Sequence, residues 1–195
     1  MKSVAVFCGS STGTSPEYVD LARALGREIA GRNLTLVFGG GRVGLMGAVA
    51  DAALKAGGEV IGVIPQALMD KELGHTGISQ LRITGSMHER KALMAQEADG
   101  FIALPGGFGT LDEFCEILTW AQLGIHEKPC GLLDTGNGFF RHLRAFFDDA
   151  VEAGFVRADH RAMVLEDTDP ASLLNRMAAW APTTTPKWIS ETPVP

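Results

Sequence analysis

Residues 105–113 combine the features of an anion-binding turn with carboxylates that could act as an acid or a base. The run Pro-Gly-Gly-Phe-Gly-Thr links an apolar stretch, a predicted strand, to an amphipathic one, a predicted helix. Such a turn presents free backbone N–H groups and the positive end of the helix dipole, which together bind phosphate. Glu113 is the best candidate for the acid or base. A structural alternative stays open, because Thr110 and Glu113 have the T-x-x-E spacing of a capping box.

Residues 86–91, Ser-Met-His-Glu-Arg-Lys, open another predicted helix. Ser86 and Glu89 match a capping box, which explains Glu89 structurally. Arg90 and Lys91 lack such an explanation, because the helix dipole opposes cations near a helix start. They predict an anionic ligand, although a solvated surface position is the alternative. The His-Glu pair begins like the zinc motif H-E-x-x-H, but Ala92 occupies the place of the second histidine.

Electrostatics connects these two segments. Asp112, Glu113 and Glu116 crowd the first turns of the helix that follows the glycine-rich turn, and they would repel a bound phosphate. Arg90 and Lys91 would compensate if their helix starts beside that turn. The residues alone therefore predict a site for a phosphorylated sugar or a nucleotide, with chemistry at the end away from the phosphate.

A third segment, residues 39–44, has the sequence Gly-Gly-Gly-Arg-Val-Gly and satisfies G-x-G-x-x-G. The NAD interpretation also needs an acidic residue at the end of the next strand. That strand ends at residues 64–66, and Glu59 lies at its opposite end. No G-K-[ST] follows, so a Walker loop is excluded as well. These glycines either serve a nucleotide in another manner or form a tight, closely packed turn.

The elements that must position these segments alternate along the chain. Apolar runs predict strands, and stretches with helical periodicity predict helices, whereas residues 66–80 are expected to be irregular. This pattern indicates an α/β fold: one doubly wound, mostly parallel sheet with helices on both faces. The domain is expected over residues 1–180, with a Thr/Pro-rich tail at 181–195 in which Trp188 and Ile189 pack on the body or on a partner chain. The strands are predicted at 4–8, 34–38, 60–64, 81–84, 101–104, 131–133 and 163–165, and the helices at 16–32, 44–56, 86–98, 110–123, 139–152 and 169–180.

Composition excludes several classes of function. The 195 residues include 17 Lys and Arg against 23 Asp and Glu, a formal net charge of −6 with no basic run, so nucleic acid is not an expected partner. The apolar runs are too short to span a membrane, and the start lacks the long apolar region of a signal peptide. Cys8, Cys115 and Cys130 form neither a CxxC motif nor an even set. We therefore expect a cytoplasmic protein without disulfides or a metal site.

Four motifs together resemble the LOG (Lonely Guy) family. They are GGGRVGLMG at 39–47, SMHERK at 86–91, PGGFGTLDE at 105–113 and WAQLGIHEKP at 120–129, and the resemblance runs from about residue 4 to residue 179. This family contains the cytokinin riboside 5′-monophosphate phosphoribohydrolases, long mislabelled as lysine decarboxylases. The resemblance implies a Rossmann-like fold and hydrolysis of the N-glycosidic bond of N6-substituted AMP, which gives the free base and ribose 5-phosphate without a cofactor.

The resemblance also assigns roles to residues. Arg90 and Glu113 fall on the catalytic pair. Asp112 departs slightly from the pattern, since many relatives carry Glu there. The motif at 120–129 resembles the dimeric branch of the family and implies a homodimer. The substrate-binding positions implied in this way are Glu72, Arg90, Lys91, Gly106, Gly107, Phe108, Gly109, Thr110, Leu111 and Asp112.

Other functions remain open at this point. A general AMP or nucleotide phosphoribohydrolase acting in salvage would have the same sequence features, and so would a non-catalytic nucleotide-binding carrier module. Lysine decarboxylation would need pyridoxal phosphate on a Schiff-base lysine, for which Lys91 is the only lysine in a candidate site. Independently of the resemblance, the helix at 110–123 is apolar on more than one face, with Phe114 on one side and Trp120 on another. Such a helix is buried in a core or at an interface.

Overall fold

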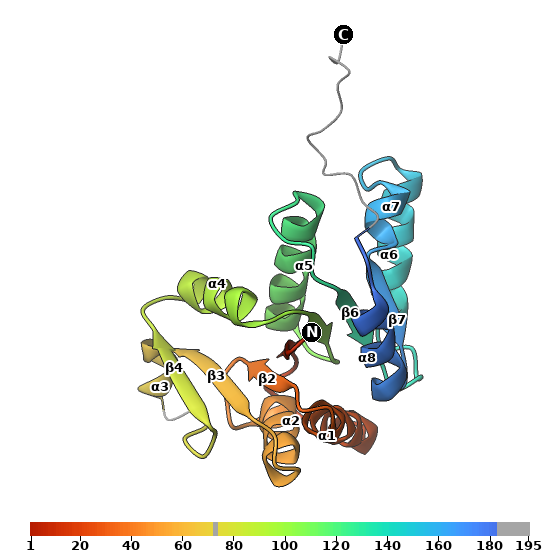
Figure 1. Ribbon diagram of the computed structural model, residues 1–195. Coiled ribbons are helices and arrows are strands. Elements are labelled where there is room, and N and C mark those ends of the chain that lie inside the picture. Colours follow the sequence, from red (N-terminus) through yellow and green to blue (C-terminus); the bar gives the residue numbers. More distant parts are fainter. Residues whose placement is uncertain (72–73, 183–195) are drawn as a thin grey trace.

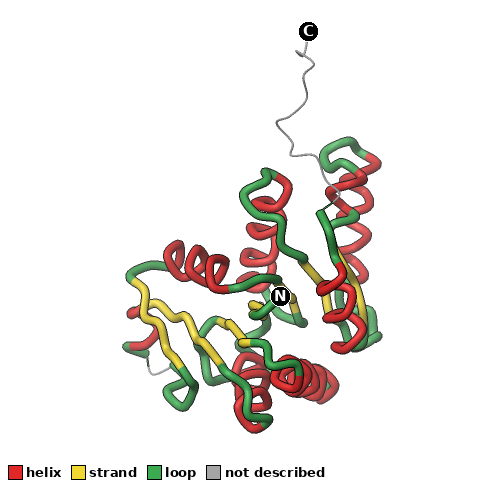
Figure 2. Tube along the Cα trace, viewed as in Figure 1, coloured by secondary structure: helices red, strands yellow, loops and turns green. Residues whose placement is uncertain are grey.

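The computed structural model describes residues 1–71 and 74–182, in which strands and helices alternate along the chain (Figures 1 and 2). The bounds confirm the predicted alternation. In chain order the elements are β1 (Ser3–Phe7), α1 (Pro16–Gly31), β2 (Thr35–Phe38), α2 (Gly44–Lys55), β3 (Val60–Pro65), α3 (Gln66–Met69), β4 (Gln80–Thr84), α4 (Met87–Glu97), β5 (Phe101–Ala103), α5 (Phe108–Gln122), β6 (Cys130–Leu133), α6 (Arg141–Glu152), α7 (Ala158–Arg161), β7 (Val164–Asp167) and α8 (Pro170–Ala179).

Side-chain caps fix the starts of several helices. Ser15 Oγ accepts the Glu17 N–H at 3.4 Å ahead of Pro16, which is the predicted start of α1. Ser86 Oγ accepts the Glu89 N–H at 3.2 Å, and Glu89 Oε2 accepts the Gly85 N–H at 2.7 Å. The capping box predicted for α4 is confirmed, with its return bond one residue earlier than usual.

The sheet has the order β4-β3-β2-β1-β5-β6-β7, and every pair of its neighbouring strands is parallel. The chain builds outward from β1 to β4 and then returns to the other side of β1, so the order reverses between β1 and β5. Ligands of open α/β sheets bind beyond the carboxyl ends of the strands at such a reversal. Here the Gly9 N–H donates to the Pro105 carbonyl at 3.1 Å, which holds the two loops of the crevice together.

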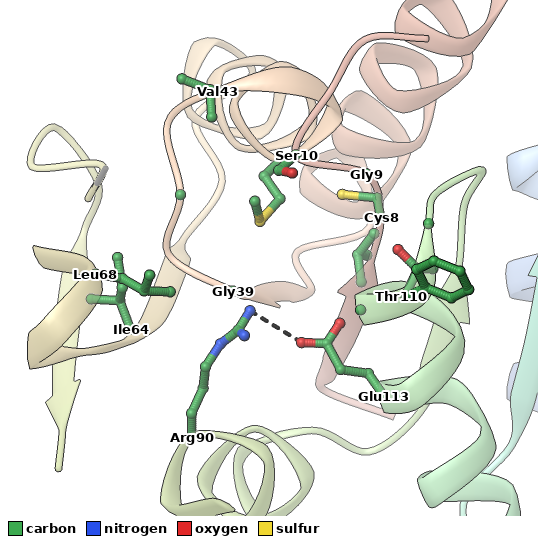
Figure 3. A pocket seen from close by; sticks show the side chains of 16 residues that line it. Cys8, Gly9, Ser10, Gly39, Val43, Ile64, Leu68, Arg90, Thr110 and Glu113 are labelled. Atoms are coloured by element: carbon green, nitrogen blue, oxygen red, sulfur yellow. Dashed lines mark ion pairs between the residues drawn. The ribbon is translucent and has the colours of Figure 1, made fainter. Parts of the chain in front are cut away.

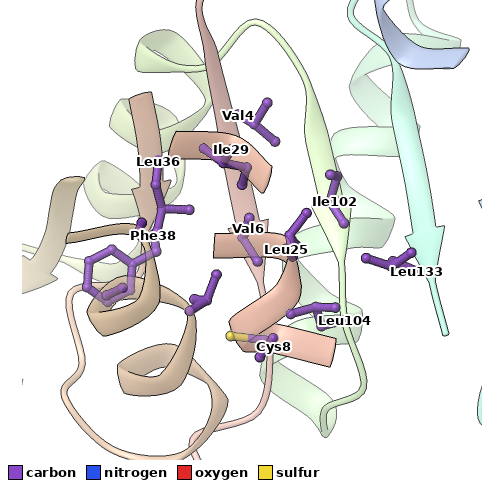
Figure 4. Packing of buried hydrophobic residues seen from close by; sticks show 14 of the residues in the cluster. Val4, Val6, Cys8, Leu25, Ile29, Leu36, Phe38, Ile102, Leu104 and Leu133 are labelled. Carbon is purple, nitrogen blue, oxygen red and sulfur yellow. The ribbon is translucent and has the colours of Figure 1, made fainter. Parts of the chain in front are cut away.

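Helices cover both faces of the sheet, as predicted for a doubly wound fold. Val4, Val6 and Leu36 face a core shared with α1, α2 and α8 (Figure 4). Their neighbours Ala5 and Val37 face the opposite core, shared with α4 and α5. This alternation follows from the two-residue period of a strand, and it leaves the strand ends free to carry a site.

Some local predictions need correction. Residues 66–80, expected to be irregular, include the one-turn helix α3, and α7 has no counterpart in the predicted set. Helix α5 begins at Phe108, two residues before the predicted start. The tail predicted at 181–195, with Trp188 and Ile189, lies outside the described residues from 183 onward. No helix of the described ranges is long and apolar enough to cross a membrane.

Candidate active site

A cavity of about 380 Å³ opens at the carboxyl ends of β1, β2, β3 and β5, the crevice that the strand order defines (Figure 3). One side is formed by the start of α5, and α4 contributes Arg90. The lining residues are Val6, Cys8, Gly9, Ser10, Gly39, Gly41, Val43, Met46, Ile64, Leu68, Arg90, Gly107, Phe108, Gly109, Thr110 and Glu113.

Arg90 and Glu113 form an ion pair in this cavity. Arg90 Nη2 lies 3.1 Å from Glu113 Oε1, and the two side chains are only 10% and 9% exposed (Figure 3). Arg90 Nε also donates to the Val63 carbonyl at 3.1 Å, which fixes the plane of the guanidinium. The two residues that the family resemblance assigns to catalysis are thus in contact, although they come from different helices.

The carboxyl group of Glu113 is electrostatically unusual. Burial raises its pKa above the ordinary value, and the positive charge of Arg90 opposes this effect without cancelling it. Nearby Asp112 raises the pKa further. A carboxylate kept in a partly dry environment beside a cation suits acid–base work near neutral pH.

The start of α5 decides between two interpretations of Glu113. Gly107 is the N-cap and no side chain caps the helix, so Thr110 lies inside the first turn. The alternative interpretation of Thr110 and Glu113 as a capping box is therefore excluded. Glu113 is free for another role, and no side chain caps the first N–H groups of α5, at residues 108–110. Unpaired N–H groups and the positive end of a helix dipole of this kind can bind an anion.

Lys91 lies in a different direction from Arg90. Its Nζ is 3.1 Å from Asp112 Oδ2 and 3.2 Å from Glu116 Oε1, and it is not among the residues that line the cavity. Burial lowers the pKa of Lys91, but the bonds to Asp112 and Glu116 outweigh that effect and raise it. The two cations thus pair with all three carboxylates at the start of α5 and offset most of their charge, as the charge pattern predicts.

The other predicted binding positions divide into two groups. Gly107, Phe108, Gly109 and Thr110 line the cavity, and Phe108 is 93% exposed at its edge. Gly106, Leu111 and Asp112 do not line it. Gly106 instead packs closely on Thr110, where an added Cβ would lie 2.1 Å from Oγ1. Glu72 lies outside the described residues.

Sequence reasoning missed several lining residues, among them Cys8, Ser10 and Leu68. Cys8 and Ser10 follow β1, so the rule that ligands bind beyond strand ends could have found them. Burial raises the pKa of the Cys8 thiol well above its usual range, and the charge of Glu113 adds to this. The thiol is therefore protonated and a poor nucleophile.

The fold and this site define a class of protein: a Rossmann-like α/β protein with a buried Arg–Glu ion pair in a cavity at the sheet's reversal point. The family whose description is "Possible lysine decarboxylase" matches residues 46–177. A rice protein (Oryza sativa subsp. japonica) named "Probable cytokinin riboside 5'-monophosphate phosphoribohydrolase" is 49% identical over 93% of this chain and 79% of its own length. A cytokinin riboside 5′-monophosphate phosphoribohydrolase of Arabidopsis thaliana is 46% identical over 93% and 84%. The chain belongs to this LOG family.

Solved structures agree with the fold. The structural-genomics target TM1055 superposes with a TM-score of 0.71 at 24% identity, covering 92% of this chain and 100% of that one. The molybdenum cofactor carrier protein of Chlamydomonas reinhardtii gives 0.69 at 22% identity, covering 91% and 98%. At these identities the likeness concerns the fold alone.

Proposed function

We propose that this protein hydrolyses the N-glycosidic bond of N6-substituted adenosine 5′-monophosphate and releases the free cytokinin base and ribose 5-phosphate. The observation that carries the proposal is the buried Arg90–Glu113 pair, placed beside the uncapped start of α5. The names of the relatives at 46–49% identity support the same reaction.

The start of α5 binds the phosphate in this proposal. The N–H groups at residues 108–110 point out of the helix end, and Gly107 and Gly109 leave room for close approach, since no atom would meet a Cβ there within 4 Å. Apolar side chains from Val43, Ile64 and Leu68 form the wall across the cavity from Thr110 (Figure 3). The base and its N6 group contact that apolar wall. The ribose therefore lies between the base and the phosphate, next to Arg90 and Glu113.

Glu113 acts on the sugar. Cleavage of the C1′–N9 bond sends its electron pair to the base and builds positive charge on the ribose. A carboxylate beside C1′ stabilises that charge and accepts a proton from the attacking water, whose oxygen bonds to C1′. The proton then returns to the departing base, so the products are the neutral base and ribose 5-phosphate. Arg90 holds the Glu113 carboxylate in place and orients the ribose.

The Lys91 contacts argue against the older lysine decarboxylase description. A Schiff-base lysine must lose its proton to attack the cofactor aldehyde. Lys91 instead bridges two carboxylates that raise its pKa, and it lies off the cavity. Its role in this proposal is to neutralise Asp112 and Glu116, which lets the helix start accept a phosphate.

The pH dependence of the reaction follows from Glu113. Because burial raises its pKa, the carboxylate forms only at a pH above the ordinary glutamate range, which is about 4.3. We expect kcat/KM to rise with pH through this raised pKa. The unfolded chain would ionise earlier, so the same group lowers the free energy of unfolding as pH rises between the two values. A pH–rate profile whose acid limb lies at or below the ordinary value would contradict this assignment.

The proposal includes a homodimer in the cytoplasm that acts on a small nucleotide and not on nucleic acid. Large apolar side chains are exposed after the end of α5 and in and after α6: Ile125 is 64% exposed, Phe146 65% and Phe155 83%. Water-exposed apolar surface of this kind marks interaction sites, and a second copy is the usual partner. The net charge of −6 argues against a nucleic-acid partner, and the three free cysteines fit a reducing compartment.

Substitution of Phe155 by Asp, alone and with Phe146→Asp, should convert the dimer to a monomer, because burying a new carboxylate at the interface is costly. Light scattering at micromolar concentration measures the mass. Ile83→Asp is the matched control, since Ile83 is 51% exposed on β4 at the opposite edge of the sheet. A wild-type protein that is monomeric under these conditions would overturn the dimer.

Chromatography of the base released from AMP and from N6-isopentenyl-AMP, side by side, tests the function. Faster release from the N6-substituted nucleotide is the expected result. Equal release from both would keep the chemistry and replace the cytokinin role with salvage. Binding of AMP without release would reject the hydrolase and favour a carrier module, the kind of role that the Chlamydomonas protein's name describes.

A further inference from the structure

The glycine at position 39 occupies a place where any side chain would meet the catalytic arginine. Gly39 directly follows β2 and lies at the tip of the Arg90 side chain (Figure 3). A Cβ on Gly39 would lie 2.0 Å from Arg90 Nη2, 3.1 Å from its Cζ and 3.2 Å from Met46 Sδ. The first of these distances is far shorter than any van der Waals contact, so the guanidinium occupies the space that a side chain would need.

Backbone conformation does not require glycine at this position. Gly40 and Gly44 have φ values of 72° and 64°, in the left-handed region that other residues avoid. Gly39 is not among the residues with positive φ. Alanine is therefore compatible with its backbone, and the only severe contact is with the end of a flexible side chain. Displacement of the guanidinium is therefore the change that accommodates a methyl group at the lowest cost in free energy.

We infer that Gly39 is a positioning residue for Arg90. Its missing side chain leaves the guanidinium room between the Val63 carbonyl, 3.1 Å from Nε, and the Glu113 carboxylate, 3.1 Å from Nη2. The first glycine of the G-x-G-x-x-G segment thus makes room for the arginine. This inference rests on the proposed function for its effect on turnover, but the placement of Arg90 is testable without it.

Substitution Gly39→Ala should lower kcat about 10- to 100-fold, the usual effect of moving a catalytic group by about 1 Å, with a smaller change in KM. Gly31→Ala is the matched control: Gly31 lies in α1, and a Cβ there would meet nothing within 4 Å. We expect wild-type kcat for Gly31→Ala. Wild-type kcat for a folded Gly39→Ala protein would overturn the inference.

A double-mutant cycle with Arg90→Ala separates positioning from general damage. If Gly39 acts through the guanidinium, adding Gly39→Ala to Arg90→Ala should change neither kcat nor the urea midpoint of unfolding, because the colliding group has gone. Equal losses from Gly39→Ala in both backgrounds would reject the inference. The unfolding cycle gives this answer even if the wild-type protein releases no base, so failure of the proposed function is distinguishable.

Discussion

Replacing Glu113 by Gln should lower kcat about 100- to 10,000-fold, the range that a positioned acid–base group contributes. Gln has nearly the same shape and keeps an oxygen that can accept from Arg90, but it cannot take a proton from water or carry the charge that stabilises an oxocarbenium ion. The substitution tests the carboxylate with little change in packing. Base release from N6-isopentenyl-AMP under saturating conditions measures the effect, and the acid limb of the pH–rate profile should disappear with it.

We also expect Glu113→Gln to lower the free energy of unfolding, so stability must be measured together with kcat. Arg90 and Glu113 are buried together, and removing one charge of a buried pair costs about 3–5 kcal/mol because the other charge stays desolvated. Thermal unfolding and circular dichroism establish that the variant is folded at the assay temperature. Glu166→Gln is the control: Glu166 pairs with Arg144 and Arg161 at 3.2 and 2.9 Å, away from the cavity. Near-normal turnover by a folded Glu113→Gln protein would assign the carboxylate a structural role.

The first residue of α5 could not be predicted from the sequence, although it decides the role of Glu113. The spacing of Thr110 and Glu113 fits a capping box and a catalytic helix equally well, and only the first residue of the helix distinguishes them. Three glycines within 106–109 favour a longer turn by propensity, yet the helix begins at Phe108. Burial of Thr110 against Gly106 and docking of the helix on the sheet override that local preference.

The different positions of Arg90 and Lys91 are a second feature that the sequence does not determine. Adjacent helical residues point about 100° apart, so Arg90 reaches Glu113 in the cavity, whereas Lys91 reaches Asp112 and Glu116 outside it. The charge pattern predicts that both cations compensate the carboxylates, which the ion pairs confirm. It does not predict which of them reaches the cavity, because that depends on the rotation of α4 against β3. For the same reason, the sequence does not show that the Arg90 guanidinium needs the space left by Gly39.

The strands could be predicted because burial on both faces requires a continuous run of apolar residues, which is visible in the sequence. The strands β1, β3, β5 and β6 are buried on both faces, so their sequences are mostly apolar runs such as residues 60–64. The longer helices carry caps and a 3.6-residue period. The one-turn helices α3 and α7 are too short to show a period, which explains why they were not predicted.

Removal of the guanidinium is the second large effect that we expect. Arg90→Met keeps the length of the side chain but leaves the Glu113 carboxylate without its cation, and kcat/KM should fall about 100-fold or more. Since the charge of Arg90 lowers the pKa of Glu113, its loss should raise that pKa and move the acid limb of the pH–rate profile to higher pH. This upward shift distinguishes the variant from Glu113→Gln, in which the limb is absent.

Arg90→Lys separates charge from geometry. Lysine restores a cation near Glu113, so the acid limb should move back toward its wild-type position. All its donors are on one nitrogen, however, and it cannot reproduce the planar arrangement in which Arg90 Nε bonds the Val63 carbonyl while Nη2 contacts Glu113. We therefore expect the pH profile to recover while most of the loss in kcat remains. Arg161→Met is the control, because Arg161 pairs with Asp148 and Glu166 outside the cavity. Full recovery of kcat by lysine would mean that Arg90 acts by charge alone, and the orientation of the guanidinium would then carry no part of the rate.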